Sequence, residues 1–167
     1  MTVLDHPQEQ TAIRSPWGLF LDDHATSAEF PRAATEEAAD ALIARGGRVM
    51  VTRLSQVHDT RRQGRITQHI LLARRKGWVA FVGEGGARLA AAHVSDAVRL
   101  YRLALENGAA GARYHAVAEE GVALRDIAEV IGGGLKMPVR SITLEAAADY
   151  FGPLAMLVTI DLAASSA

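Results

Sequence analysis

The stretch FVGEGGARLAAAHVSDAVRLYRLALENG, residues 81–108, joins a short apolar strand, a glycine-rich turn, an alanine run and an amphipathic helix. Proteins that hold a dinucleotide on a parallel sheet place a strand, glycines and a helix in this order. The helix is predicted by apolar side chains that recur at helical spacing. They are Val94, Ala97, Val98, Tyr101, Ala104 and Leu105, and we expect this stripe, Tyr101 included, to belong to the core.

The spacing of the glycines argues against a phosphate-binding loop in this stretch. The dinucleotide fingerprint G-x-G-x-x-G needs its third glycine for close packing of the helix on the strand. Gly83 and Gly85 occupy the first two positions, but Arg88 stands at the third. The helix also begins only at about Val94, so its N-terminus would not face the turn. We interpret the other glycine cluster, residues 132–134, as a helix stop.

Helices and strands alternate on both sides of this stretch. We expect strands over residues 48–54, 78–83, 113–119 and 138–144, where apolar and β-branched residues dominate. We expect helices over residues 31–47, 65–77, 94–108 and 122–135, and two closing helical segments over residues 144–152 and 153–162. This alternation predicts an α/β fold with a largely parallel sheet. Residues 1–29 form an irregular N-terminal segment, and residues 30–167 form the domain.

Composition excludes several classes of function. The chain has 167 residues, no cysteine and a net charge of −1, so it offers no basic field for nucleic acid or anionic lipid and no thiolate metal site. Its six histidines lack metal-ligand spacing, and no G-x-S-x-G motif of a serine hydrolase occurs. No signal sequence or membrane-spanning run is evident, and we expect a cytoplasmic protein.

Two longer stretches, RGGRVMVTRLSQVHD over residues 45–59 and residues 76–142, carry a resemblance to a known family. They resemble the C-terminal half of an extended or atypical short-chain dehydrogenase/reductase of the NAD-dependent epimerase/dehydratase type, and the similarity extends over residues 30–167. The resemblance implies a partial Rossmann-like parallel sheet with the C-terminal substrate-binding subdomain of that family. It also implies NAD or NADP as cofactor, although the glycine fingerprint of the family's first half does not occur in this sequence.

The resemblance also implies roles for particular residues. The family's catalytic Tyr-x-x-x-Lys pair matches Arg32 and Glu36 here, with Thr35 near the usual serine, so we expect no catalytic residue. The cofactor side is assigned to Leu54, Ser55, Gln56 and Val57, and the substrate side to His58, Arg88 and His93.

Each assignment has a structural alternative. Arg88 is either a clamp for an anion or a solvated arginine, and His58 is either a site residue or an ordinary loop histidine. We expect Ser95 or Asp96 to cap the following helix, with His93 packed beside it. The clusters Arg61–Arg62 and Arg74–Lys76 are interpreted as solvated faces.

Three functions remain open on the sequence. The favoured one is the substrate-side half of an NAD(P)-dependent oxidoreductase or epimerase that is inactive alone. The second is an active enzyme completed by a complementary Rossmann half on another chain. The third is a non-catalytic module that binds a small anionic molecule or forms a homo-oligomer.

Overall fold

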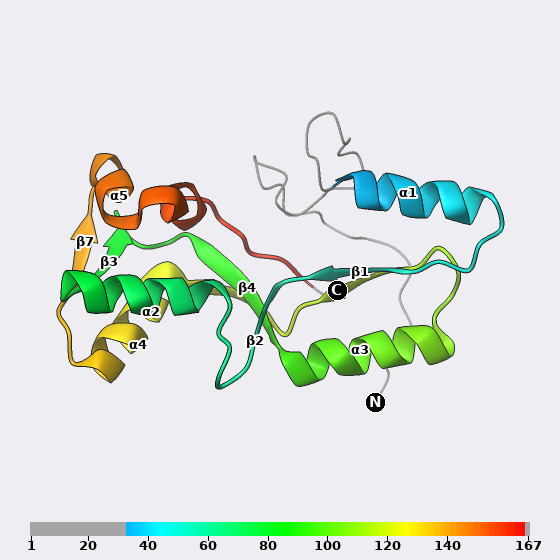
Figure 1. Cartoon of the computed structure of the whole chain (residues 1–167), viewed down its shortest axis with the longest axis horizontal. Helices are drawn as coiled ribbons and strands as arrows, with labels where there is room; N and C mark the ends of the chain where they lie inside the picture. Colours follow the sequence, from blue (N-terminus) through cyan, green and yellow to red (C-terminus); the bar gives the residue numbers. More distant parts are fainter. Residues whose placement is uncertain (1–32, 166–167) are drawn as a thin grey trace.

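A computed structural model describes residues 33–165, so the irregular segment expected over residues 1–29 and the matched position Arg32 lie outside the described residues. The described chain is elongated and has two lobes joined by strands (Figure 1). The first, which we call the β1–β5 lobe, contains α1 (Ala33–Ala44), β1 (Val51–Leu54), α3 (Val94–Asn107) and β5 (Arg113–Ala116). The second, the α2–α4 lobe, contains α2 (Arg65–Lys76), β3 (Val79–Val82), α4 (Leu124–Leu135), β7 (Val139–Ile142), α5 (Leu144–Phe151) and the 3-10 helix η1 (Gly152–Val158). Between them run β2 (Gln56–His58), β4 (Arg88–His93) and β6 (Glu119–Ala123).

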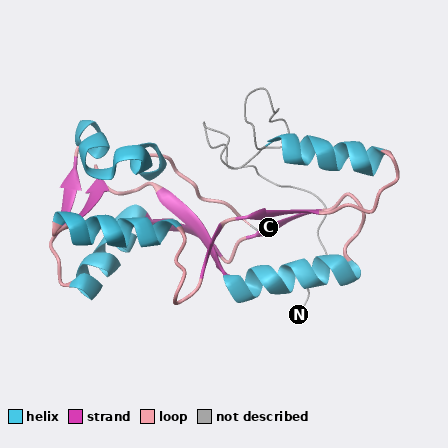
Figure 2. Ribbon diagram, in the orientation of Figure 1, coloured by secondary structure: helices cyan, strands magenta, loops and turns pink. Residues whose placement is uncertain are grey.

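The strands form three small sheets with mostly parallel pairing. The pairs β1–β5, β2–β4 and β3–β7 are parallel, and β6 joins β4 in antiparallel orientation. The α/β class and the largely parallel sheet are therefore confirmed. Figure 2 shows how the helices flank these strands at both ends of the molecule.

Three strands escaped the sequence analysis, namely β2, β4 and β6. Their sequences QVH, RLAAAH and EEGVA are short or rich in alanine and glutamate, which have low intrinsic preference for strands. Strand β4 exists because β2 and β6 bond to it on both sides. Tertiary pairing, which local composition does not reveal, decides these elements.

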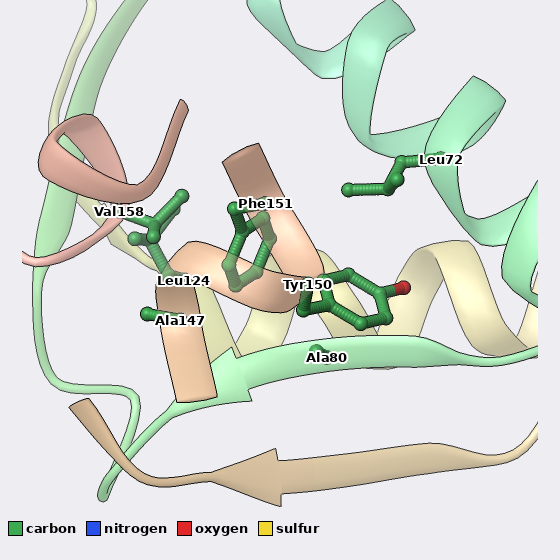
Figure 3. Close-up of a cluster of buried hydrophobic side chains, with 7 residues drawn as sticks. All are labelled: Leu72, Ala80, Leu124, Ala147, Tyr150, Phe151 and Val158. Carbon is green, nitrogen blue, oxygen red and sulfur yellow. The ribbon is translucent and has the colours of Figure 1, made fainter. Parts of the chain in front are cut away.

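The core of the α2–α4 lobe is built around aromatic side chains. Tyr150 and Phe151 of α5 lie over β3 together with Leu72 of α2 (Figure 3). The Tyr150 hydroxyl donates a 2.6 Å hydrogen bond to the Trp78 carbonyl, so this buried polar group is satisfied. Two smaller clusters extend this core between α2, α4 and β4.

One expectation about a particular residue is wrong, because Tyr101 was assigned to the core but is 44% exposed on α3. The glycine cluster at residues 132–134 lies in the last turn of α4, which ends at Leu135 as expected, and Lys136 after it takes the left-handed conformation with φ 53°. Gly132 also permits close packing, since a Cβ atom there would lie 2.3 Å from Cγ2 of Val139.

The glycine turn at residues 83–86 packs against the start of α4. Gly85 has φ 69°, and its carbonyl accepts a 3.1 Å hydrogen bond from the Arg125 amide. A Cβ atom at Gly85 would lie 2.6 Å from Cβ of Arg125 and 2.9 Å from the Phe81 ring. The glycine is needed for this contact between the turn and the helix, which gives it a structural role without a bound phosphate.

Candidate functional site

A groove of about 680 Å³ lies between α2, α4 and the β2–β4–β6 sheet. Helix α2 presents Ile66 and Ile70 to it, and α4 presents Ile127 and Ile131 from the other side. Its apolar lining is Ile66, Ile70, Leu71, Leu89, Ala91, Val122, Ile127, Val130, Ile131 and Leu135. Its polar lining is Gln56, His58, Arg61, Gln63, Thr67, Arg74 and Glu119. Small-molecule sites commonly combine a mainly apolar wall with a few polar groups in this way.

The two histidines assigned to the substrate side, His58 and His93, lie close together at the carboxyl ends of the parallel strands β2 and β4. His58 and His93 are partners in the strand register, and their ring centroids are 5.8 Å apart. Ligands of open α/β sheets usually bind at this edge. His58 lines the groove and His93 stands next to it, outside its lining. The pair therefore marks one end of the groove.

His93 caps the N-terminus of α3, a role that was expected of Ser95 or Asp96. Its Nδ1 accepts a 3.3 Å hydrogen bond from the Ser95 amide, so His93 itself is the N-cap of α3. The expectation that Ser95 or Asp96 caps this helix is wrong. Nδ1 also lies 2.8 Å from the Ser95 hydroxyl oxygen.

The loop after His58 is ordered by Asp59. Its carboxylate accepts hydrogen bonds from the amides of Arg61 (2.6 Å) and Arg62 (2.5 Å). These backbone bonds lower the pKa of Asp59 because they stabilise its ionised form. They hold Asp59 in the turn, while Arg61 borders the groove.

The four residues assigned to the cofactor side have separate environments. Leu54 is 47% exposed at the end of β1, and the Ser55 hydroxyl donates a 2.7 Å hydrogen bond to the Ala116 carbonyl. Val57 pairs in the sheet with a residue of β4. Gln56 alone among these four lines the groove. Their role in cofactor binding stays a prediction.

Arg88 is engaged in an ion pair. Its Nη2 donates to Oδ2 of Asp161 at 2.7 Å, and its amide donates to Oδ1 at 3.0 Å. The guanidinium lowers the pKa of Asp161, chiefly through this side-chain hydrogen bond. This ion pair connects β4 to the C-terminal segment. The Arg88 side chain does not line the groove. Its role as an anion clamp stays a prediction.

Glu36, which stands at the position matched to the family's catalytic lysine, belongs to an ion-pair network. Its carboxylate accepts hydrogen bonds from Arg53 at 2.7 and 2.8 Å and from Arg113 at 3.2 Å. Arg113 also bonds Asp40 at 2.5 Å. The network ties α1 to β1 and β5. The hydrogen bond from Arg53 is the largest cause that lowers the pKa of Glu36, against the opposing effect of burial.

Glu36→Gln is expected to lower the free energy of unfolding by about 2 kcal/mol, the usual range for hydrogen bonds to charged groups. Glu36 and Arg53 side chains are each 14% exposed, so water compensates little. Urea unfolding at pH 7 measures the change. Glu106→Gln is the matched control, because its pair with Arg102 is exposed on the surface of α3 and should shift the value by less than about 0.5 kcal/mol. Equal losses in both variants would contradict the structural role of the Glu36 network.

Most of the groove was not predicted from the sequence. Residues 65–77, which include Ile66 and Ile70, were expected only as a helix, and Arg61 and Arg74 only as solvated positions. Arg61 and Arg74 are exposed, as expected, but they also border the groove. The groove is formed by two helices more than forty residues apart in sequence, so no local pattern marks it.

The described residues do not fit the pyrophosphate of a dinucleotide at the glycine turn. The turn leads into strand β4 rather than a helix, and the space above Gly85 is filled by Arg125 and Phe81. In residues 33–165 no three histidine, aspartate or glutamate side chains are arranged to hold a metal ion. No helix in this part of the chain has the length and apolar character needed to cross a bilayer.

The fold corresponds to part of the Rossmann-like fold of solved epimerases and dehydratases of the short-chain dehydrogenase/reductase type. The dTDP-glucose 4,6-dehydratase of Streptomyces venezuelae, solved with NAD bound, superposes with a TM-score of 0.56 at 22% identity, over 66% of this chain and 36% of that one. The UDP-glucose 4-epimerase of Thermus thermophilus, solved with NAD, gives 0.53 at 17% identity over 66% and 39%. The human epimerase family protein SDR39U1, solved with NADPH, gives 0.52 at 22% identity over 70% and 39%. The family resemblance seen in the sequence is thus confirmed at the level of the fold.

Two curated yeast proteins are similar in sequence, and both are described as uncharacterized. C2A9.02 of Schizosaccharomyces pombe is 37% identical over 137 residues, which are 81% of this chain and 46% of that protein. YLL056C of Saccharomyces cerevisiae is 38% identical over 136 residues, with the same coverage of 81% and 46%. The chain spans about half the length of these relatives. No protein-family model matches the sequence.

Proposed function

We propose that this chain is the substrate-side part of an NAD(P)-dependent oxidoreductase or epimerase and that it binds a small molecule in the groove between α2 and α4. The observation that carries the proposal is that this groove lies against the β2–β4–β6 sheet and reaches His58 at the carboxyl end of β2, in a fold shared with proteins solved with NAD or NADPH. Because the groove is mainly apolar and its polar lining includes His58 and Arg61, the ligand has an apolar body and an anionic or hydrogen-bonding group for these two side chains.

The chain alone is proposed to be inactive. The described counterpart of the family's catalytic lysine, Glu36, is a carboxylate held between Arg53 and Arg113, and a carboxylate does not lower the pKa of a neighbouring hydroxyl. The glycine turn is filled by protein side chains, so NAD or NADP would be held by residues beyond those described here. A cytoplasmic location, which was expected from the sequence, stays a prediction.

Calorimetric titration of the full chain tests both parts of this proposal. The probes are NADH, NADPH, UDP-glucose, dTDP and octanoate, each also tested for a rise in melting temperature. We expect one of the anionic or amphiphilic probes to stabilise the protein and neither dinucleotide to bind stoichiometrically. A ligand at one hundred times its Kd raises the free energy of unfolding by about 2.7 kcal/mol, a change that thermal melting detects readily.

Single-residue variants test whether the ligand binds in the groove. Ile70→Glu places a charge in the apolar wall and is expected to abolish binding, and His58→Ala is expected to weaken it. Arg102→Ala is the control, because Arg102 lies on the exposed surface of α3 and outside the groove. A protein that no probe stabilises would overturn the groove assignment, and tight stoichiometric NADH binding by the chain alone would overturn the proposal that these residues do not hold the cofactor by themselves.

A second candidate function is a chain that acts only in a complex. It is favoured by the exposed apolar side chains of the β1–β5 lobe, which include Val98, Tyr101 and Leu105.

A further inference from the structure

The groove between α2 and α4 follows both helices over most of their length. Helix α2 lines it at positions 66, 67, 70, 71 and 74, and α4 lines it at positions 127, 130, 131, 134 and 135. Each set has the spacing of a single helix face, and at a rise of 1.5 Å per residue each wall is about 12 Å long. A groove with two such walls is shaped for an elongated ligand rather than a compact one.

The connections of the two helices define the two ends of the groove. Both helices begin after strands of the β2–β4–β6 sheet, and Ile66 and Ile127 near their starts pack against the cluster that contains Leu89 of β4. Both helices end before the paired strands β3 and β7, where Val79 stands opposite Val139. The starts of α2 and α4 therefore lie together at the sheet, and their ends lie together at the far end of the groove.

Most polar residues of the lining lie at the sheet end. Gln56 of β2 and Glu119 of β6 both stand opposite Ala91 of β4, and His58 is the last residue of β2. Arg61 follows in the next loop, and its guanidinium carries a permanent positive charge. This end therefore suits an anionic group. Because Glu119 repels added negative charge, a singly charged carboxylate fits better than a diphosphate.

The wall beyond the sheet end is aliphatic. The apolar lining consists of isoleucine, leucine, valine and alanine, and among the described residues no phenylalanine, tyrosine or tryptophan lines the groove. Nucleobases commonly stack on such aromatic rings, and sugar hydroxyls need hydrogen-bond partners, which only Thr67 offers between the two ends. Arg74 at the far end is exposed, so its charge stays in water while its hydrocarbon stem borders the groove. An unbranched hydrocarbon chain suits this wall.

We propose that the groove binds a single-chain aliphatic carboxylate, with the carboxylate at Arg61 and His58 and the hydrocarbon chain between α2 and α4. This inference rests on the proposed function, because it names the substrate class of the same groove. The chain would cover Leu71 and Val130, which are 45% and 75% exposed. Gly134 lines the far end without a side chain, and a Cβ atom there meets nothing within 4 Å, which leaves room for the end of a long chain.

A chain-length series tests the proposal. The full chain is titrated calorimetrically with hexanoate, octanoate, decanoate and dodecanoate, each below its micelle concentration. We expect the Kd to fall by about two- to fourfold for each added methylene, because each one leaves water for the aliphatic wall. A Kd that stays constant along the series overturns the proposal.

A variant at the far end tests where the hydrocarbon chain lies. Gly134→Leu fills the space there, so dodecanoate should bind at least tenfold more weakly while octanoate stays within about twofold. Gly133→Leu is the matched control, because Gly133 is adjacent in α4, its Cβ also meets nothing within 4 Å, and it does not line the groove. Circular dichroism and melting temperature confirm that both variants are folded. Equal weakening of dodecanoate by both overturns the proposal.

A second variant tests the position of the carboxylate. Arg61→Gln should weaken octanoate and dodecanoate alike, by at least tenfold. Arg62→Gln is the control, because Arg62 is also exposed, its amide bonds the same Asp59 carboxylate, and it lies outside the lining. Equal effects of the two variants overturn the placement of the carboxylate at Arg61.

UDP-glucose and dTDP separate this inference from the proposed function. If either of them binds, Ile70→Glu abolishes the binding and no aliphatic carboxylate binds, the groove is a ligand site but the substrate class proposed here is wrong. If none of these probes binds, both proposals are overturned.

Discussion

Lowering the pH from 6.5 to 4 is expected to reduce the free energy of unfolding by about 3 kcal/mol through His69 alone. His69 lies on α2 with its side chain against Phe151, at 5.7 Å between ring centroids, and the residue is 8% exposed. Its Nε2 has no hydrogen-bond partner among the described residues. Burial, and to a smaller extent the positive charge of Arg65, lowers the pKa of His69 from 6.5 to about 4.

The sign follows from proton binding in the two states. Between pH 6.5 and 4 the imidazole is protonated in the unfolded chain and neutral in the folded one, so stability falls as the pH falls. Above pH 6.5 the imidazole is neutral in both states, so His69 does not reduce the stability. Below about pH 4 it is protonated in both states, and the loss of stability is complete.

Urea unfolding followed by circular dichroism between pH 7 and 5 measures this loss. The pKa values of Glu36 and Asp161 are lowered from 4.5 and 3.8, so these two carboxylates titrate below that range. About 2 kcal/mol should be lost by pH 5. His69→Leu removes the titrating group and should flatten the profile. A profile as steep in the variant as in the parent would show that another group is responsible.

Gly85→Ala is expected to lower the free energy of unfolding by about 2–4 kcal/mol. One part of this cost is the backbone, because Gly85 has φ 69°, where an alanine is strained by about 1 kcal/mol. The other part is overpacking, which typically costs about 1–3 kcal/mol, since the new Cβ would lie 2.6 Å from Cβ of Arg125. Thermal melting and urea unfolding both measure it.

Gly86→Ala is the control for this variant. Gly86 is adjacent in the same turn, but a Cβ atom there meets nothing within 4 Å and its φ is not positive. It should change stability by less than about 0.5 kcal/mol. If both variants were equally destabilised, the contact between the turn and α4 would not be the cause.

Much of the fold could be predicted from local sequence. Helix α2 was expected over residues 65–77 and is found over Arg65–Lys76, because its apolar face and final glycine are local signals. The strands β3 and β7 were located for the same reason, as compact apolar runs. Strands β2, β4 and β6 were missed, because hydrogen bonds to distant strands stabilise them rather than their own composition.

Some features of the candidate site could likewise be predicted from the sequence, and others could not. The sequence pointed to His58, and the structure places it at one end of the groove. It also pointed to Arg88, which the structure shows paired with Asp161, a residue 73 positions away that no spacing argument connects to it. Tyr101 was expected in the core because an apolar stripe predicts burial, but burial also needs a neighbouring layer, and α3 has only part of one here.

By itself, the sequence determined the α/β class, the order of most helices and strands, and the absence of a dinucleotide fingerprint in the turn at residues 83–88. Those features depend on residue type and on spacing along the chain, which are local properties. Only the tertiary structure shows that Arg125 of α4 occupies the space beside Gly85. It also shows that α2 and α4 line a groove and that the apolar stripe of α3 is partly exposed. These features depend on which surfaces meet across long stretches of chain, and the free energy of such contacts is not encoded in any single segment.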